Sequence, residues 1–461
     1  MTTKLNEKYK ININVEEVSL TVFGGVKLKK VLIVDHHKDT LIYVNRLKTN
    51  ILDWNKMLDV NLIFGDIALD GVYFNMKTYK NEKISNLDYF VNAFDSGKPP
   101  SKEKFLLTAS KVKITNGHYV LTDQNRANPK DVDFKKLNIA ATALRIYGPE
   151  VSTTINKMSF LDHRGIEIKS LSTKFSYNTK HIRLENLDLL TKESKVQGSV
   201  VMNYDIEDFA HFTDKVEFDI RLEKASIGSN DIRGFYDELG KNQYFKIKGR
   251  IKGPLNNLVI TNLKLVDSRN SQIEGTINFK NLFPNNGKTF YLNGKFAKLS
   301  TSYNNLVATL PNVLGKKLPI VLKKLGTINL VGVAQVTTTS VDARFNMATE
   351  LGKVNSNLSI KNMQLSDKAS YIGNIILDDF DLGELLDRND LGSASLNLDV
   401  NGTGFSEKYL NTFIEGDVSK INFRKYNYTN VALKGDFRKG LYKGAISVND
   451  PNLKMNFDLL F

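Results

Sequence analysis

Apolar and polar residues alternate along most of the chain, in short segments separated by polar turns. Segment 216–223 shows the alternation most clearly, because every apolar residue is followed by a charged one: Val216, Glu217, Phe218, Asp219, Ile220, Arg221, Leu222 and Glu223. A period of two residues is typical of a β-strand with one apolar and one polar face. Segments 396–400 and 453–459 repeat the pattern, and we expect about 25 to 30 strands in all.

A two-strand unit recurs within this pattern. One copy covers residues 187–202 and a second covers residues 263–279, and each has a glycine near the start of its second strand, Gly198 or Gly275. A looser copy covers residues 431–448. Recurring hairpins of this kind predict a repetitive, stackable sheet rather than a compact enzyme core.

Helices are expected to be few and short. Helical spacing of apolar residues occurs in segments 52–58, 84–95, 206–212, 232–239 and 303–325. The last segment is the longest, and Pro311 and Pro319 should break or kink it. Segment 96–100, Ser-Gly-Lys-Pro-Pro, predicts a surface loop or a linker.

A sheet of this many strands has to curl, because open twisted sheets rarely exceed ~10 strands without curling or splitting. The apolar face of the curled sheet can then be covered or left open. In a filled sandwich, the two halves of the curl pack on each other. In an open trough, the apolar face stays accessible and could hold acyl chains. The alternation by itself favours the filled sandwich.

Composition narrows the classes of function. The 461 residues carry a net charge of +14, but the basic residues are scattered among acidic ones, so nucleic acid is not an expected partner. The chain has no cysteine, which excludes disulfides, thiolate metal sites and thiol nucleophiles. The sequence has no run of 18 consecutive apolar residues, so no membrane-spanning helix is predicted.

Catalytic motifs are scarce, and we expect neither an enzyme nor a cofactor. Segment 35–39, Asp-His-His-Lys-Asp, is the only cluster that looks like a metal site. His36 and His37 are neighbours in a strand-to-turn segment, where successive side chains would point in opposite directions. We therefore interpret the segment as an exposed turn without a metal. Segment 402–404, Gly-Thr-Gly, lacks the helix and the third glycine of a phosphate-binding loop.

Short motifs along the whole chain resemble those of one protein family. In the N-terminal part they are Gly25-Val26-Lys27-Leu28, segment 35–41, Leu69-Asp70-Gly71 and Asn86-Leu87-Asp88. In the C-terminal part they are segment 380–386, Leu391-Gly392, segments 396–404 and 426–431, Gly435, segment 449–453 and Phe457. In their order and spacing, these motifs resemble the TamB proteins of Bacteroidota, in the wider AsmA-like group.

The resemblance implies a mainly β fold: an elongated, curled, antiparallel repeat sheet (a β-taco or repeating β-groove) with a few short helices. It implies an N-terminal AsmA-like β region with short helices (1–100), a repetitive β-groove body with helical insertions (101–326) and continuing groove repeats (327–461). Compared with the family, the N-terminal anchor helix and the C-terminal segment are absent, which predicts that the chain is part of a longer protein.

The resemblance also implies a function in the periplasm of a Gram-negative cell, with the full-length protein held at the inner membrane by its anchor. Such a groove protein would move phospholipid between the inner and outer membranes. It would also support the assembly and secretion of outer-membrane proteins and autotransporters. The absent C-terminal segment would engage an outer-membrane barrel partner of the Omp85 type.

The resemblance turns the preference from the filled sandwich to the open trough. Phospholipid acyl chains are expected to lie against apolar residues of several strands, namely Val216, Phe218, Ile220, Leu222, Ile247, Ile251, Ile277, Phe279, Leu396, Leu398 and Val400. Ordinary core packing is the alternative interpretation of each of these residues.

Two other functions remain open. The recurring hairpins have edge strands that could template the strands of outer-membrane proteins without carrying lipid. A β-solenoid that binds polysaccharide is less favoured, because such sites commonly use exposed aromatic residues on a flat face. This chain has a single tryptophan, Trp54, and its tyrosines are dispersed.

Overall fold

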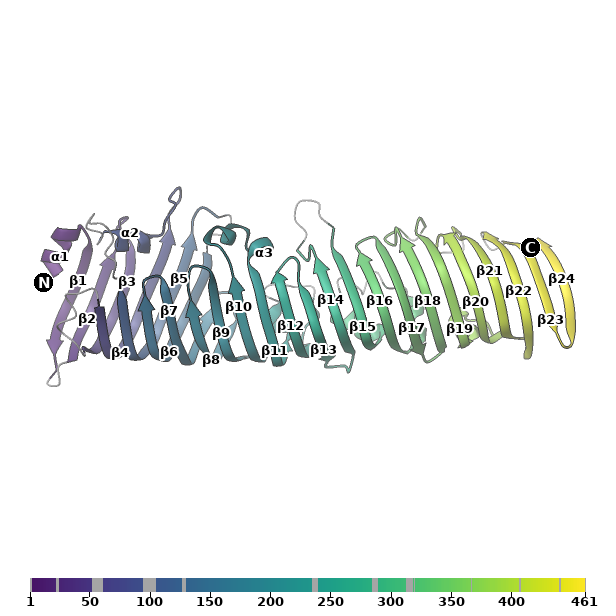
Figure 1. Ribbon diagram of the computed structural model, residues 1–461, viewed down its shortest axis with the longest axis horizontal. Helices are drawn as coiled ribbons and strands as arrows, with labels where there is room; N and C mark the ends of the chain where they lie inside the picture. The colour runs from purple at the N-terminus through teal and green to yellow at the C-terminus, as the bar shows by residue number, and fades with distance from the viewer. Residues whose placement is uncertain are drawn as a thin grey trace. The chain divides into compact units, whose positions relative to one another are not determined.

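The structure, a computed structural model, describes every residue except 1, 22–24, 52–60, 94–104, 127–129, 234–238, 284–288, 312–317, 319, 366, 406–407, 439–440 and 461. Over the described residues the protein is mainly β, with 24 strands in one sheet and a few short helices (Figure 1). This confirms the predicted fold class.

Contacts divide the chain into two compact units. Unit 1 comprises residues 1–209 and 220–227, and unit 2 comprises residues 210–219 and 228–461. Strand β11 (Glu217–Gly228) contributes to both. The division falls inside the predicted region 101–326, and the three regions drawn from the sequence remain a prediction.

The strands of unit 1 lie side by side in chain order. They are β1 (Asn12–Leu20), β2 (Gly25–Val34), β3 (Thr40–Ile51), β4 (Asn61–Thr78), β5 (Leu106–Asp123), β6 (Lys130–Tyr147), β7 (Glu150–Asp162), β8 (Glu167–Tyr177), β9 (His181–Thr191) and β10 (Lys195–Asn203). Neighbouring strands are antiparallel except β4 and β5, which run parallel. The sheet is therefore antiparallel, as expected, except at this pair. Its connection includes α2, because a parallel pair needs a crossover instead of a tight turn.

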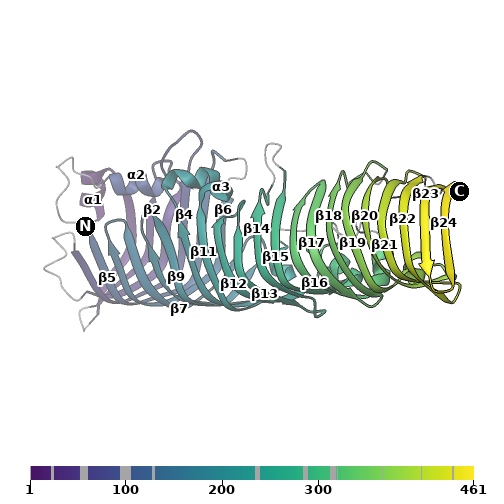
Figure 2. The same ribbon diagram turned by 45° about the vertical axis from the view of Figure 1, so that its right-hand side comes forward.

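Unit 2 is a succession of antiparallel strands that also follow chain order. They are β12 (Tyr244–Pro254), β13 (Val259–Asp267), β14 (Gln272–Lys280), β15 (Tyr291–Ser302), β16 (Thr327–Thr337), β17 (Ser340–Thr349), β18 (Gly352–Lys361), β19 (Ser370–Asp381), β20 (Leu391–Thr403), β21 (Asn411–Phe423), β22 (Tyr426–Arg438), β23 (Leu441–Asp450) and β24 (Leu453–Leu460). Figure 2 shows that these strands bend along their length, so that the sheet of unit 2 is curled.

The helical segments are short. They are α1 (Thr2–Tyr9), α2 (Asn86–Asn92), η2 (Ile206–His211), α3 (Phe212–Lys215), α4 (Ser229–Ile232), α5 (Tyr303–Thr309), η3 (Ile320–Leu325) and α6 (Leu382–Leu386). The predicted helices in 84–95 and 206–212 are confirmed by α2, η2 and α3. Segment 303–325 is not one helix, because α5 ends before Pro311 and η3 begins after Pro319.

Two other helix expectations fall wholly or largely outside the described residues. The predicted helix 52–58 lies outside the described residues. Helix α4 ends at the start of segment 232–239, most of which is also outside the described residues. Helix α6 was not predicted. Its sequence signal is Asp381, whose side chain accepts a hydrogen bond from the backbone N–H of Glu384 at the start of the helix.

The recurring two-strand unit corresponds to a pair of adjacent strands in each copy: β9–β10 and β13–β14. The first strand of each pair bulges at an asparagine with a positive φ, Asn186 (52°) or Asn262 (51°). In the looser copy, Asn430 has a φ of 50°. Gly198 and Gly275 lie near these bulges, and a Cβ at either position would overlap the carbonyl oxygen of a neighbouring strand. The recurring glycine therefore permits the close approach of two backbones.

Asp450 organises the turn between β23 and β24. Its side chain is almost fully buried. The carboxylate accepts hydrogen bonds from Tyr426 Oη (2.7 Å), from the backbone N and Oγ1 of Thr429 (3.0 Å each) and from the backbone N of Asn452 (2.9 Å). These bonds, led by that of Tyr426, lower the pKa of Asp450 to about 2.

The stability of this turn is expected to depend on pH. The folded-state pKa of Asp450, about 2, lies below the unfolded-state value of about 3.9. The ionised carboxylate therefore stabilises the folded state fully above about pH 4, and this contribution is lost as the pH falls through about 2. We expect Asp450→Asn to lower the urea midpoint at neutral pH and to weaken its dependence on acid.

The measurement is urea unfolding of both proteins from about pH 6 down to about pH 2. Asp436→Asn is the control, because Asp436 is an exposed carboxylate on β22 that lies 3.6 Å from Arg438. A wild type and an Asp450→Asn variant with the same dependence on acid would contradict the prediction.

Candidate functional site

The register of unit 2 aligns residues, all but Ser356 of them apolar or glycine, into rows that cross the strands. The first row consists of Leu299, Leu330, Met347, Val354, Leu377, Leu396, Val418, Val431, Val448 and Met455. The second row consists of Phe296, Gly332, Phe345, Ser356, Ile375, Leu398, Gly416, Leu433, Ile446 and Phe457. We call the side of the sheet that carries both rows the apolar face. It forms because alternate residues of each strand share one side and the pairing register aligns them.

The apolar face is only partly protected from solvent. Within the two rows, only Val418 and Ser356 are buried, and the other side chains are intermediate in exposure. A second layer packed on these rows would bury them. On the opposite side of β16, Val331 and Val333 are 52% and 46% exposed. The difference places the apolar face on the inside of the curled sheet, and its partial exposure favours the open trough over the filled sandwich.

Three helical segments of unit 2, namely α5, η3 and α6, pack on one another and on strands of the sheet. Helix α5 contacts β15 and η3, and α6 contacts β20 and η3. Lys324 of η3 donates to the carbonyl oxygens of Glu384 (2.9 Å) and Leu385 (3.1 Å). Phe380 and Ala394, on the strands that flank α6, are buried. Burial in this part of unit 2 is therefore concentrated near the helices, while the rows stay accessible.

Seven of the predicted lining residues lie on the apolar face. In β20, Leu396 belongs to the first row and Leu398 to the second. Ile277 and Val400 are the two ends of a third row on the same face. The positions between them, each paired with the next, are Gly294, Ala334, Ala343, Leu358 and Gly373. Phe279 lies on the same side of β14 as Ile277. The last two residues of this group, Ile247 and Ile251 of β12, pair with Leu265 and Ile260 of β13.

The other four lining residues lie in or just before β11. Asp219 forms an ion pair with Arg250 on the polar side of β12, and alternation then places Phe218 on the apolar side. Ile220 is partly exposed. Val216 is fully buried and Leu222 is buried, as is Ile277 of the previous group, so these three side chains are packed as core residues.

The face opposite the apolar face, which we call the polar face, has a different chemistry. Asn374 donates hydrogen bonds to Asn397 Oδ1 and Asp399 Oδ1, both at 2.8 Å. Lys434 lies 2.8 Å from Glu415. A shallow hollow among these side chains is lined by residues such as Asn374, Asp399 and Glu415. Exposed pairs of this kind stabilise a protein only weakly. The polar face therefore presents less apolar surface to an apolar ligand than the apolar face does.

Unit 1 contains a second candidate site, at the turn that joins β2 to β3. Asp35, which is 8% exposed, shapes this turn. Its Oδ1 accepts hydrogen bonds from the backbone N–H groups of His37 and Asp39, both at 2.9 Å, and its Oδ2 accepts from Tyr79 Oη (2.8 Å) and Asn86 Nδ2 (2.9 Å). Burial alone would raise the pKa of Asp35, but these hydrogen bonds outweigh it and hold the pKa below its usual range.

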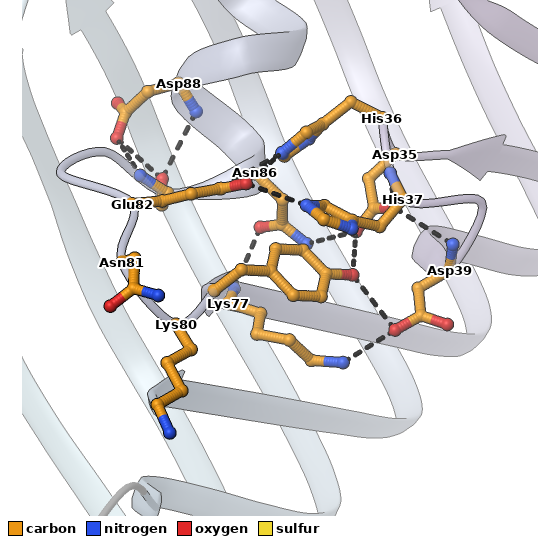
Figure 3. Close-up of polar contacts among 12 residues, drawn as sticks. Asp35, His36, His37, Asp39, Lys77, Lys80, Asn81, Glu82, Asn86 and Asp88 are labelled. Atoms are coloured by element: carbon orange, nitrogen blue, oxygen red, sulfur yellow. Dashed lines mark hydrogen bonds and ion pairs between the residues drawn. The ribbon is translucent and has the colours of Figure 1, made fainter. Parts of the chain in front are cut away.

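The turn brings two histidines onto one carboxylate, as Figure 3 shows. His36 Nε2 lies 3.1 and 3.2 Å from the two carboxylate oxygens of Glu82, and His37 Nε2 lies 2.7 Å from Glu82 Oε1. The His36 ring stacks on Tyr89, and the His37 ring stacks on Tyr79. These contacts lower the pKa of Glu82, with the hydrogen bond of His37 as the largest cause.

The expectation that His36 and His37 point in opposite directions is wrong. Both residues lie in the turn after β2 instead of in the strand, so strand alternation does not apply to them. Glu82 was missed because it lies more than 40 residues further along the chain. Pairing of the start of β3 with the end of β4 brings the two segments together. The sequence around residues 36–37 gives no signal of that pairing.

The chain matches no family model, no curated protein and no solved structure. The resemblance to the TamB family therefore stays a prediction. None of the described helices is long and apolar enough to cross a membrane.

Proposed function

We propose that the protein binds phospholipid acyl chains along the apolar face of unit 2 and moves phospholipid between the inner and outer membranes from the periplasm. In this way it supports the assembly and secretion of outer-membrane proteins and autotransporters. The observation that carries the proposal is that two rows of aligned apolar residues, from β15 to β24, stay partly exposed in the described residues. Soluble proteins rarely leave a large continuous apolar surface exposed unless it binds something.

The chemistry of the apolar face suits a flexible hydrocarbon better than a ligand of fixed shape. The rows offer leucine, valine, isoleucine and phenylalanine side chains, and two glycines of the second row, Gly332 and Gly416, leave shallow places between them. Burial of each methylene group contributes about 0.8 kcal/mol, and this attraction is not directional. An acyl chain can therefore slide from one strand to the next without breaking specific contacts.

The free energy of moving acyl chains from a bilayer into the groove also suits transfer between membranes better than permanent storage. A phospholipid that enters the groove leaves a bilayer in which its acyl chains are already buried. The free energy of about 0.8 kcal/mol per methylene group is therefore lost and regained in nearly equal amounts. Movement along such a face needs no chemical step, and the phospholipid can leave at the other end at little cost.

The proposal predicts that phospholipid accompanies the purified chain. The experiment is native mass spectrometry of the 461-residue protein, followed by organic extraction and identification of the lipids. We expect several phospholipids per chain, because the rows span many strands and one acyl chain covers only a few of them. A well-folded chain that stays free of lipid, even after incubation with phospholipid vesicles, would contradict the proposal. The alternative of a scaffold that templates outer-membrane protein strands would then be preferred.

A further inference from the structure

His36, His37 and Glu82 present a set of donors that resembles an open metal site. One ligand atom from each of the three residues lies within 4.8 Å of the other two. Two imidazole nitrogens and one carboxylate are a ligand set that Zn²⁺ uses in sites with an open fourth position. Ligands at about 2.0–2.2 Å from a tetrahedral ion are roughly 3.3 Å apart. The Nε2-to-oxygen distances of 2.7–3.2 Å are therefore close to the required geometry.

The backbone of Glu82 and the ring of His37 are held in place by their surroundings. The carbonyl oxygen of Glu82 accepts a hydrogen bond from Asn125 Nδ2 (3.0 Å), and the neighbouring Asn81 N–H donates to Asn125 Oδ1 (2.8 Å). Tyr79 stacks on His37, and its hydroxyl group is fixed by Asp35 and Asp39. Orientation of the ligands by such neighbours is a common feature of metal sites.

The site is also accessible. The side chains of His36, His37 and Glu82 are 28%, 45% and 19% exposed. An ion can therefore reach the three donors from solvent, and the carboxylate and the rings can move apart by the few tenths of an ångström that coordination needs. Imidazole donors favour zinc and its neighbours in the first transition series, whereas Ca²⁺ and Mg²⁺ prefer oxygen ligands.

We propose that His36, His37 and Glu82 bind a divalent transition-metal cation of the zinc class, with water in the fourth position. The ion joins two segments of unit 1, the turn between β2 and β3 and the loop that leads from β4 to α2. It therefore acts as a clamp between these segments. This inference does not depend on phospholipid binding, because unit 2 contributes none of the three ligands.

Isothermal titration of the metal-free full-length chain with ZnCl₂ tests the proposal. We expect one ion to bind per chain and the thermal midpoint of unfolding to rise when Zn²⁺ is present. His36→Ala, His37→Ala and Glu82→Gln should each weaken binding by at least about tenfold. His211→Ala is the control, because His211 is exposed and belongs to unit 2; it should bind Zn²⁺ like the wild type.

Glu82→Gln is the most informative variant, because glutamine keeps the size of the side chain and can still hydrogen-bond to the histidines. Circular dichroism of each variant verifies that the fold is kept. CoCl₂ provides an independent readout on the wild type, since four-coordinate Co²⁺ has an intense visible spectrum. Failure of the wild type to bind Zn²⁺ would overturn the proposal, and so would binding that survives all three substitutions. In the first case the cluster is a set of hydrogen bonds only.

Discussion

Replacement of Leu398 by aspartate is expected to remove phospholipid from this part of the apolar face. Leu398 is partly exposed in the second row, between Ile375 and Gly416. An acyl chain that lies over it would have to displace water from a carboxylate, which costs several kcal/mol in apolar surroundings. About 1.4 kcal/mol corresponds to a factor of ten in affinity. We therefore expect the affinity of the face around Leu398 for phospholipid to fall by at least about tenfold, and the phospholipid retained per chain to fall by the share bound there.

The neighbouring residue provides a matched control. Asn397→Asp introduces the same carboxylate into the same strand, but on the polar face, where Asn397 is exposed and already accepts a hydrogen bond from Asn374. Phospholipid is extracted from each purified variant and measured per mole of protein, and circular dichroism verifies the fold. The fold should survive because Leu398 is only partly buried, so that the new carboxylate stays hydrated in the empty groove. Equal phospholipid content in the two variants would show that the apolar face around β20 does not carry lipid.

The strands and the apolar face could be predicted from the sequence because their signal is local. Leu396, Leu398 and Val400 are two residues apart, and this spacing alone places them on one side of a strand. The neighbouring strands follow in chain order, so that the register extends the face without any long-range information. The partial exposure of the rows could not be predicted in the same way. Alternation looks the same in a filled sandwich and in an open trough.

The parts that were missed depend on contacts between distant segments. The parallel pair β4–β5 was missed because a crossover has no period of its own. The histidine–glutamate cluster was missed for a related reason, since Glu82 reaches His36 and His37 only after β3 pairs with β4. The recurring Gly198 and Gly275 were visible in the sequence, but their role became clear only from the backbone of the neighbouring strand.

Replacement of Asp35 by alanine is expected to destabilise unit 1 strongly. Asp35 is almost fully buried, and its carboxylate is the acceptor for two backbone N–H groups and two side chains, including the fully buried Asn86. Loss of an acceptor that leaves a buried donor unpaired costs about 1–3 kcal/mol per group. The two backbone N–H groups and one N–H of Asn86 lose their acceptor together, whereas Tyr79 can still donate to Asp39. We therefore expect a loss of about 3 kcal/mol or more in the free energy of opening this part of the sheet.

Hydrogen–deuterium exchange of peptides from β2, β3 and the start of α2 is the suitable measurement, because it reports local opening free energies and not only global unfolding. Asp70→Ala is the control. Asp70 pairs with Arg46 at 2.8 Å on the surface of the same unit, and an exposed pair of this kind contributes about 0–1 kcal/mol. Asp35→Asn separates charge from shape, since it keeps an acceptor oxygen and should lose less stability than Asp35→Ala. If both Asp35 variants exchanged as slowly as Asp70→Ala, the hydrogen bonds around Asp35 would not be what holds the β2–β3 turn against α2.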